Sequence, residues 1–426
     1  MTATVSLAIT QSVPDPATVP ALAMRLRRVE SRKRLRAIAL TLPLLMFLAV
    51  TFLVPLGALL IRAVENPEVA GTLRATGDAL TGWDRQTAPP DAAYAALLAD
   101  LTAIPETAQA GVLARRLNTE VSGARSLIMG TYRALPLAPL GVVLSTAQAR
   151  DKLVAHDPRW AELPYWWAIA KNSSRWTPDY LLASVDLKRD AQGHVVRVGA
   201  QEAAFSDILL RTFLISGIVT LICIVMGYPL AYWLSTLPER RANLMMILVL
   251  LPFWTSVLVR IAAWIVLLQT NGLVNRLLMF TGLTGEPVPL LFNRLGVIIA
   301  MVHILLPFMI LPLYSVMKSV PTNFVRAAVS LGSPPLAAFF RVYVPQTYPG
   351  VAAGGLLVFI TSIGYYVTPA LLGGAGDQML SYYVAQYTNV EVNWGIACAL
   401  GSVLLTTTLL LYAVYRRFAK AELSLS

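Results

Sequence analysis

The sequence predicts an all-α membrane protein with six transmembrane helices and a soluble, mainly helical extracytoplasmic insertion between the first and second spans. Hydrophobic residues make up 56% of the 426 residues, and charged residues only 13%, against the ~25% usual in soluble proteins. The mean hydropathy is +0.63. The apolar residues are also gathered into long stretches with at most one charged residue, each close to the ~20 residues that a helix needs to cross a bilayer.

The first such stretch, 37–61, follows a run of basic residues within 25–36. We predict a membrane span here and not a cleaved signal peptide, because the uncharged core exceeds the ~7 to 15 residues of a signal and no small-residue cleavage site follows it. Five further stretches have the length of a span, namely 212–237, 244–268, 295–317, 349–372 and 394–415.

Basic residues in the short segments that flank these spans indicate the orientation of the chain. Fifteen fall in the N-terminal run and in the segments that follow the second, fourth and sixth spans, against two in the loops 269–294 and 373–393. Short loops rich in lysine and arginine stay in the cytoplasm. We therefore predict a multi-pass protein with both termini cytoplasmic.

The stretch from Arg62 to Arg211 differs in composition, because it holds 16 of the 23 acidic residues and five of the nine tryptophans. We interpret it as a folded soluble insertion, with four of these tryptophans in its core, namely Trp160, Trp166, Trp167 and Trp176. Helical spacing in 91–117 predicts helices, and alternation in 194–198 predicts a strand. The expected parts of the chain are a cytoplasmic basic N-terminus (1–36), the first span (37–61), the extracytoplasmic insertion (62–206) and a five-helix core (207–420).

Catalytic patterns are not visible in the sequence. The three histidines lack the spacing of metal ligands, and no Gly-x-Ser-x-Gly motif occurs. None of the six lysines follows a glycine, which excludes a phosphate-binding loop of the Gly-Lys-Ser/Thr type. We therefore predict that the chain is not an enzyme, carries no cofactor or metal, and does not bind nucleic acid.

The cytoplasmic connection 318–345 predicts two short helices that meet at Gly332. Glycine is a natural helix stop, Ser333 is expected to cap the second helix, and Pro334 to take its first position, where the missing N–H costs nothing. The first predicted helix spans 324–331, and the second starts at Pro334 and is completed by 336–341. Apolar side chains on this water-facing loop are typical of a partner site, and the expected exposed ones are Phe324, Leu331, Phe339 and Phe340.

The same connection contains a spaced motif that reads Arg326-Ala327-Ala328-x-x-x-Gly332, then nine residues, then Val342-x-Val344-Pro345. It resembles the signature of the inner-membrane permease subunits of bacterial binding-protein-dependent ABC importers, Glu-Ala-Ala-x-x-x-Gly, nine residues, then Ile-x-Leu-Pro. The spacing is kept, and Arg326 stands where the family usually has glutamate. Three further runs are similar to the spermidine/putrescine-type branch, namely 227–233, 251–256 and 364–374.

The resemblance implies one permease subunit of an ATP-driven importer in a bacterial inner membrane. Its implied partners are a dimer of cytoplasmic ABC ATPases that carries the ATP and Mg, a second permease subunit, a periplasmic substrate-binding protein and the lipid bilayer. The implied solute is a polyamine, with opines or another small organic solute as the alternative. The implied ATPase-coupling residues are Arg326, Ala327, Ala328, Gly332, Pro334, Arg341 and Pro345.

Candidates for the translocation pathway are Trp254, Arg260, Tyr365, Tyr366 and Asp377. Arg260 would lie about 16 residues into the third span, toward the outer third of the membrane. An unpaired charge there is costly, so we expect Arg260 to pair with Asp377 or Glu391. The aromatic residues fit either a cation-accepting path or helix packing, and the intramembrane His303 fits helix packing better than a proton relay.

Two other classes of protein remain open at this point. A secondary transporter needs acidic groups in its spans for ion coupling, and the predicted spans contain none. A membrane-anchored sensor could use the 62–206 insertion as its working part, but it would not need the loop 318–345. Co-purification of an ATPase distinguishes the importer from both.

Overall fold

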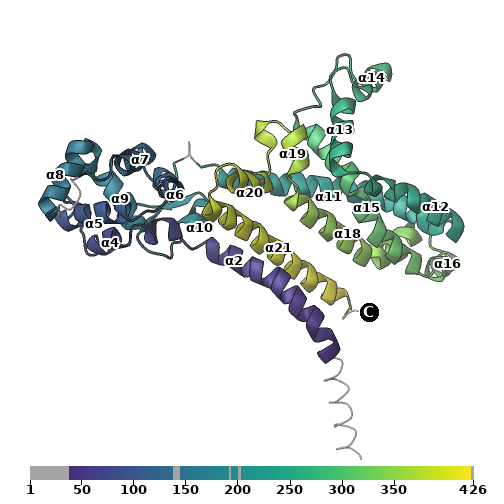
Figure 1. Ribbon diagram of the computed structural model, residues 1–426. Helices are drawn as coiled ribbons and strands as arrows, with labels where there is room; N and C mark the ends of the chain where they lie inside the picture. Colours follow the sequence, from purple (N-terminus) through teal and green to yellow (C-terminus); the bar gives the residue numbers. More distant parts are fainter. Residues whose placement is uncertain (1–37, 138–143, 191–192, 200–202, 424–426) are drawn as a thin grey trace, which may run out of the picture. The chain divides into compact units, whose positions relative to one another are not determined.

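The computed structural model describes residues 38–137, 144–190, 193–199 and 203–423, and its contacts divide the chain into two units, Met1–Leu59 and Leu60–Ser426 (Figure 1). The predicted basic N-terminus, with its cationic run within 25–36, lies outside the described residues.

The described part of the first unit is helical from Ile38 onward and belongs to the candidate span Ile38–Arg62. A π-helical turn, η1 (Ala49–Leu53), precedes α2 (Val54–Arg62). Pro55 has no N–H to donate to the preceding turn, and a π turn directly before it accommodates the missing hydrogen bond. The predicted first span is therefore a helix of the expected length.

By length and apolar composition, the described residues contain five helices that could cross a membrane, or six if one bent pair counts as a span. The predicted fold class, an α-helical membrane protein with several spans, is confirmed. Besides the first, the straight candidates are α11 (Phe205–Thr236), α15 (Arg294–Ser319), the helix formed by α17 (Pro335–Ala338), η4 (Phe339–Tyr343) and α18 (Val344–Gly364), and the first part of α21 (Trp394–Leu423).

The predicted third span, 244–268, is not one continuous helix. It consists of α12 (Glu239–Leu250), the 3-10 turn η3 (Leu251–Trp254) and α13 (Val257–Leu268), bent by 92° between the second and third pieces. The backbone is extended at Thr255 and Ser256, with ψ of 146° and 143°. Pro252 lies in the turn just before this break, where a proline ends regular helix.

The predicted fifth span, 349–372, is wrong at its far end. The helix stops at Gly364, the backbone at Tyr365 is extended with ψ 128°, and a separate helix, α19 (Val367–Leu372), follows. In a continuous helix the ring of Pro369 would clash with the carbonyl of Tyr365 four residues earlier. The remaining short elements of this part are α14 (Leu273–Phe280), α16 (Asn323–Ser330), η5 (Ala375–Asp377) and α20 (Leu380–Asn389).

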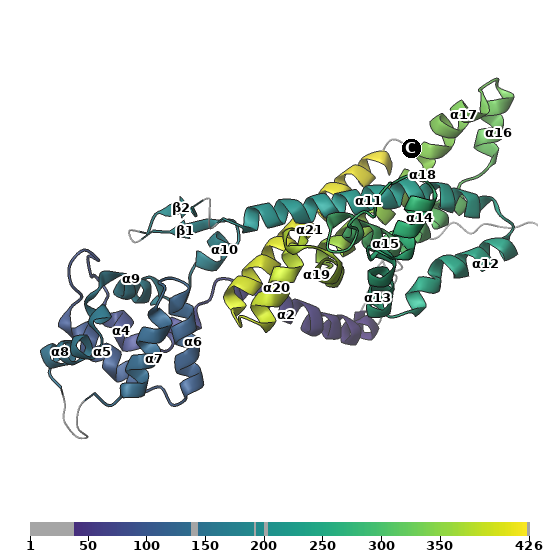
Figure 2. The same cartoon turned by 90° about the horizontal axis from the view of Figure 1, so that it is seen from above.

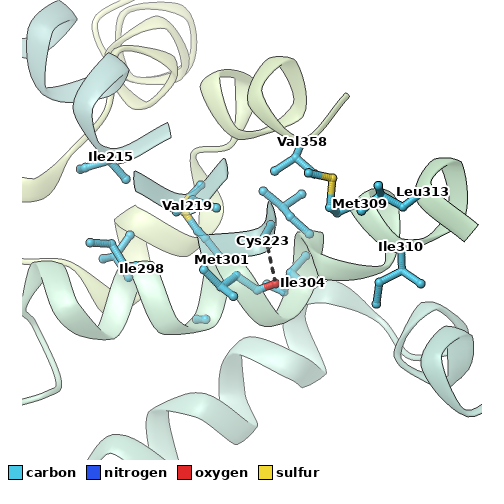
Figure 3. Packing of buried hydrophobic residues seen from close by; sticks show 14 of the residues in the cluster. Ile215, Val219, Cys223, Ile298, Met301, Ile304, Met309, Ile310, Leu313 and Val358 are labelled. Atoms are coloured by element: carbon cyan, nitrogen blue, oxygen red, sulfur yellow. Dashed lines mark hydrogen bonds between the residues drawn. The ribbon is translucent and has the colours of Figure 1, made fainter. Parts of the chain in front are cut away.

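The apolar core of the second unit is built around α15, which packs against α11 and α18 (Figures 2 and 3). Glycines let these helices approach closely: a Cβ on Gly227 would lie 3.1 Å from Met309 Cγ, and one on Gly350 3.0 Å from Val316 Cβ. Close approach at small residues is how membrane helices gain packing energy. Cys223 is fully buried in this core, as predicted for a small apolar residue.

The chain between the first two candidate spans forms a helical region that we call the 63–190 region. Its elements are α3 (Pro67–Ala70), α4 (Arg74–Ala79), α5 (Asp91–Thr102), α6 (Thr107–Asn118), α7 (Ala124–Ala134), α8 (Thr146–His156), η2 (Pro158–Ala161), α9 (Leu163–Asn172), α10 (Asp179–Ala183) and β1 (Leu187–Arg189), which pairs antiparallel with β2 (Val195–Arg197). The helical and strand patterns predicted here are both present.

Two of the four tryptophans predicted to lie in the core of the 63–190 region do so. Trp160 and Trp166 are fully buried with ring centroids 5.6 Å apart, and Tyr94 packs on Trp166 at 4.5 Å. The indole N–H of Trp160 donates to Thr131 Oγ1 at 2.9 Å, so its polar atom is satisfied. The prediction of four core tryptophans is wrong for Trp176, which is 55% exposed.

Asp186 ties the 63–190 region to the start of α11. Its carboxylate accepts hydrogen bonds from the backbone N–H groups of Ala204, Phe205 and Ser206 at 3.1, 3.0 and 2.6 Å. Burial disfavours its charge, but these bonds and the Ser206 hydroxyl outweigh that effect and lower the pKa of the carboxyl. Asp186 therefore caps α11 from 18 to 20 residues away in sequence.

Asp186→Ala is expected to destabilise the protein by about 0.5–2 kcal/mol, the usual cost of a lost N-cap. Asp186→Asn should lose less, because the amide oxygen still accepts. Since the folded-state pKa is lowered, the stabilisation is present above the ordinary carboxyl pKa and is lost as the pH falls through the folded pKa. Thermal melts of the detergent-solubilised protein at neutral and acidic pH measure this, and equal melting temperatures for wild type and Asp186→Ala at neutral pH would contradict it.

Candidate functional site

The connection between α15 and α18 has the predicted two-helix shape, and we call 322–341 the elbow. α16 ends in a left-handed turn at Gly332, whose φ is +93°. The N–H of Ser333 donates to the carbonyl of Ala328 at 3.0 Å, and the N–H of Gly332 to that of Val329 at 3.0 Å. This pair of bonds is the Schellman motif, in which glycine at the left-handed position satisfies the last carbonyls of a helix.

The second helix of the elbow starts one residue later than predicted. Pro334 is the N-cap, with φ −55° and ψ 142°, and Pro335 holds the first helical position. Ser333 therefore does not cap this helix. The reason is steric, because a residue that precedes proline is disfavoured in the helical region, so Pro335 forces Pro334 to stay extended.

Large apolar side chains are exposed on the elbow, as predicted. Phe324, Leu331, Leu336 and Phe340 are 53%, 88%, 73% and 62% exposed. Among the coupling residues implied by the resemblance, Ala328 is half-buried and the exposed ones are Arg326, Ala327, Gly332, Pro334, Arg341 and Pro345. Arg326 forms no ion pair within the described part of the chain.

Phe339 was predicted to be exposed, and that prediction is wrong. It is half-buried, with its ring 5.1 Å from that of Tyr232 on α11 and stacked on Tyr343 at 5.4 Å. The π-helical turn Phe339–Tyr343 brings both aromatic rings onto the face that meets α11. This π turn is followed by a helix, α18, whose second residue is Pro345. The first span has the same arrangement, because η1 is followed by α2, whose second residue is Pro55.

Arg260 lies in the first turn of α13, directly after the break in the third candidate span. Its predicted depth in the membrane assumed a straight helix, and the bend of 92° before α13 contradicts that assumption. Within the described residues its guanidinium has no hydrogen bond or ion pair, and its Nε is buried without a partner. The expected pairing with Asp377 or Glu391 is not formed.

Both of those acids are engaged elsewhere. Asp377 accepts from Nε of Arg294 at 3.0 Å and from the N–H of Gly374 at 3.2 Å, so it holds the segment after α19 against the start of α15. Glu391 accepts from the amide of Gln386 at 3.3 Å. Asp377 therefore has a structural contact that its sequence position did not reveal.

Arg260 instead belongs to a cluster of aromatic and imidazole groups. It lies close enough to His303 on α15 and to Tyr365 after α18 to interact electrostatically with both. The indole N–H of Trp264 donates to Nδ1 of His303 at 3.2 Å, and the two rings meet edge to face. His303 is thus hydrogen-bonded to a neighbouring helix, as expected of a packing residue.

The other pathway candidates lie at the helix breaks. Trp254, at the end of η3, is 74% exposed, and Tyr366, between α18 and α19, is 43% exposed. The sequence reasoning missed Trp264. Its position four residues after Arg260 was the available signal, because residues four apart share one helix face.

Comparison with known proteins identifies the fold. The family described as "Binding-protein-dependent transport system inner membrane component" matches residues 201–422, slightly more than half of the chain. The chain belongs to this family. It is a permease component of an ABC importer in the inner membrane, and its role is transport and not catalysis. The residues before 201, with the whole 63–190 region, lie outside the match.

Named relatives agree with the resemblance seen in the sequence. This permease is 36% identical over 214 residues to the spermidine/putrescine transport system permease protein PotB of Haemophilus influenzae, covering 50% of this chain and 74% of that one. It is 35% identical over 217 residues to PotB of Escherichia coli, covering 51% and 78%. The predicted membership of the spermidine/putrescine-type branch is confirmed.

A similar solved structure is the bacterial alginate ABC transporter in complex with an alginate pentasaccharide-bound periplasmic protein. The match covers 51% of this permease and 78% of that chain, with 18% identity and a TM-score of 0.43.

Proposed function

We propose that this permease carries polyamines of the spermidine or putrescine kind through the membrane, powered by a separate ATPase. The relatives that carry this solute in their names support the proposal, because they are 36% and 35% identical to this chain over about half of its length and three quarters of their own. The permease itself would hold no nucleotide, and ATP and Mg would bind the partner ATPase.

The observation that carries the coupling part of the proposal is the elbow. A nucleotide-driven change on another chain can move this one only through a contact that differs between two states. The elbow offers a preorganised contact, because the Schellman motif fixes the angle between α16 and α17 while Phe324, Leu331, Leu336 and Phe340 remain exposed. In our proposal these side chains enter a groove on the ATPase, and the bundle rocks when two ATPase copies close.

The proposed transporter contains two further kinds of subunit. A second permease subunit completes the pathway, and a periplasmic binding protein delivers the solute from the outer side.

Both termini lie in the cytoplasm, and the 63–190 region lies outside it. The basic asymmetry of the flanking segments supports this orientation, since cationic loops are retained in the cytoplasm.

Reporter fusions test the orientation. An alkaline phosphatase fusion after Arg150 is expected to be active, because that enzyme matures outside the cytoplasm, and a fusion after Ser333 to be inactive. A green fluorescent protein fusion at the same two sites should give the reverse pattern. Phosphatase activity after Ser333, or fluorescence after Arg150, would contradict the six-span orientation.

A second solute class is favoured by one observation, the unpaired Arg260 beside His303 and Tyr365. A bare cation in the pathway repels a polyamine and attracts a carboxylate. An opine or another solute that carries a carboxylate therefore remains the alternative.

Uptake by the complete transporter in proteoliposomes separates the two. Labelled spermidine should enter in the presence of ATP, the binding protein and the ATPase, and unlabelled putrescine should compete while an opine should not. Competition by the opine alone would replace the polyamine with a carboxylate-bearing solute.

A further inference from the structure

A cleft of about 360 Å³ lies where the 63–190 region meets the loop between α20 and α21. One wall is α6, with Arg115 and Arg116, and the opposite wall is the loop, with Glu391 and Val392. Val392 has a φ of +53°, a strained conformation for a β-branched residue. The cleft is lined by residues 390–393, which lie inside the family match, and by residues that precede the match.

The lining of the cleft is rich in unpaired cations. Arg115 and Arg125 are exposed and form no ion pair within the described residues. Of the two glutamates that line the cleft, Glu68 is already paired with Arg62. The side chains that face an approaching group therefore present an excess of positive charge.

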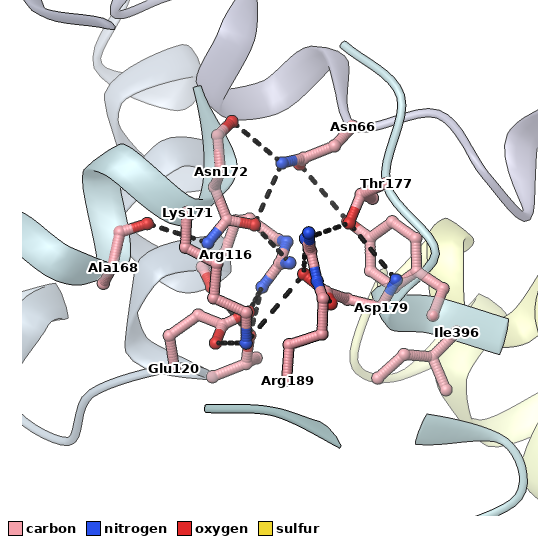
Figure 4. A network of polar contacts seen from close by, with 12 residues as sticks. Asn66, Arg116, Glu120, Ala168, Lys171, Asn172, Thr177, Asp179, Arg189 and Ile396 are labelled. Carbon is pink, nitrogen blue, oxygen red and sulfur yellow. Dashed lines mark hydrogen bonds and ion pairs between the residues drawn. The ribbon is translucent and has the colours of Figure 1, made fainter. Parts of the chain in front are cut away.

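The network behind the cleft does not neutralise that charge (Figure 4). Arg116 is 7% exposed and donates to Glu120 at 3.0 Å, and Lys171 donates to the same carboxylate at 2.8 Å. Arg189 pairs with Asp179 at 2.6 Å. These three cations face two carboxylates. Burial opposes the charge of Glu120, but Arg116 and Lys171 outweigh this effect and lower the pKa of Glu120. Each oxygen of this carboxylate already accepts a hydrogen bond from one of these two cations.

The floor of the cleft touches the last candidate span. The guanidinium of Arg116 lies 4.9 Å above the ring of Tyr180, and this ring packs on Gly395, the second residue of α21. A Cβ at Gly395 would lie 2.3 Å from Tyr180 Cζ, so only glycine fits there. A group that enters the cleft would therefore lie next to the side chain that packs on the start of α21.

We infer that this cleft is a docking socket for an acidic side chain of the periplasmic binding protein, and this inference rests on the proposed function. The carboxylate would sit between Arg115 and Arg125, with Arg116 behind it. Arginines at an exposed rim suit a protein partner, because they form paired hydrogen bonds to carboxylates and are enriched at interfaces. A pocket for a free solute would instead be enclosed and mostly apolar.

The test uses the complete transporter in lipid nanodiscs and measures ATP hydrolysis as its cognate binding protein is titrated. Arg115→Glu and Arg125→Glu are expected to raise the half-saturating concentration of binding protein at least about tenfold, since each change replaces an attraction with a repulsion. ATP hydrolysis without binding protein should stay unchanged. Arg115→Lys should retain part of the response, and Arg74→Glu, at an exposed position of α4, is the matched control and should behave like wild type.

Two results would overturn the socket. One is an unchanged half-saturating concentration in both charge reversals. The other is protection of the wild type against thermal unfolding by millimolar succinate, lost in Arg115→Glu without any change in the response to binding protein, which would assign the cleft to a free carboxylate. A wild-type complex that the binding protein does not stimulate at all would instead overturn the proposed function, and the socket with it.

Discussion

Gly332→Val is expected to abolish ATP-driven solute uptake while the membrane helices stay folded. The left-handed φ of +93° costs a residue with a side chain about 1–2 kcal/mol, and a β-branched residue is the worst case. The two Schellman bonds depend on that conformation, so α16 would no longer stop where α17 begins. Uptake and binding-protein-stimulated ATP hydrolysis should fall together, because force no longer passes between the chains.

Gly332→Asn is the matched control for this change. Asparagine tolerates the left-handed conformation better than other residues with a side chain, and no heavy atom lies within 4 Å of the Cβ position. It should retain most of the uptake. The coupling role of the elbow is contradicted if Gly332→Val transports as wild type does.

Gly354→Val is expected to disrupt the membrane core. A Cβ at this position would lie 2.5 Å from Met309 Sδ and 3.0 Å from the carbonyl oxygen of Met309. The methionine sulfur can move, but the backbone of α15 cannot, so α18 would have to shift away from the centre of the bundle. Overpacking of this kind costs about 1–3 kcal/mol, and more when backbone must move. The purified protein should aggregate on size exclusion or melt several degrees earlier.

The neighbouring Gly355 provides the control. Its Cβ would meet Ile224 Cδ1 at 3.7 Å, which is ordinary van der Waals contact. Gly355→Ala should therefore elute and melt like wild type, whereas Gly354→Ala should already be destabilised. Equal stability of these two alanine variants would show that the contact between α15 and α18 is looser than described.

Long apolar stretches could be identified from the sequence because a bilayer imposes one length on every span. The bend of 92° within the third candidate span could not, since Pro252 predicts a kink but not its angle, and the extended residues Thr255 and Ser256 carry no strong signal. The end of α18 at Gly364 was also missed, although Pro369 five residues later gave a physical reason for it.

Within the candidate sites, local backbone chemistry was predictable and long-range pairing was not. Gly332 acts through its own φ, so its role as a helix stop could be predicted from its neighbours alone. The contacts of Phe339 with Tyr232, and of Asp377 with Arg294, join elements more than 80 residues apart. The predicted pairing of Arg260 was wrong for the same reason. Its two candidate partners, Asp377 and Glu391, are bonded to Arg294 and Gln386 instead.

Crosslinking from the elbow tests the central claim most directly. A photoreactive amino acid at Leu331, which is 88% exposed on the elbow, is expected to give a covalent adduct with the co-purified ATPase. The same amino acid at Phe280, which is 89% exposed at the end of α14 in a loop on the predicted outer side, should give none. An ATPase adduct from position 280 and none from 331 would contradict the account.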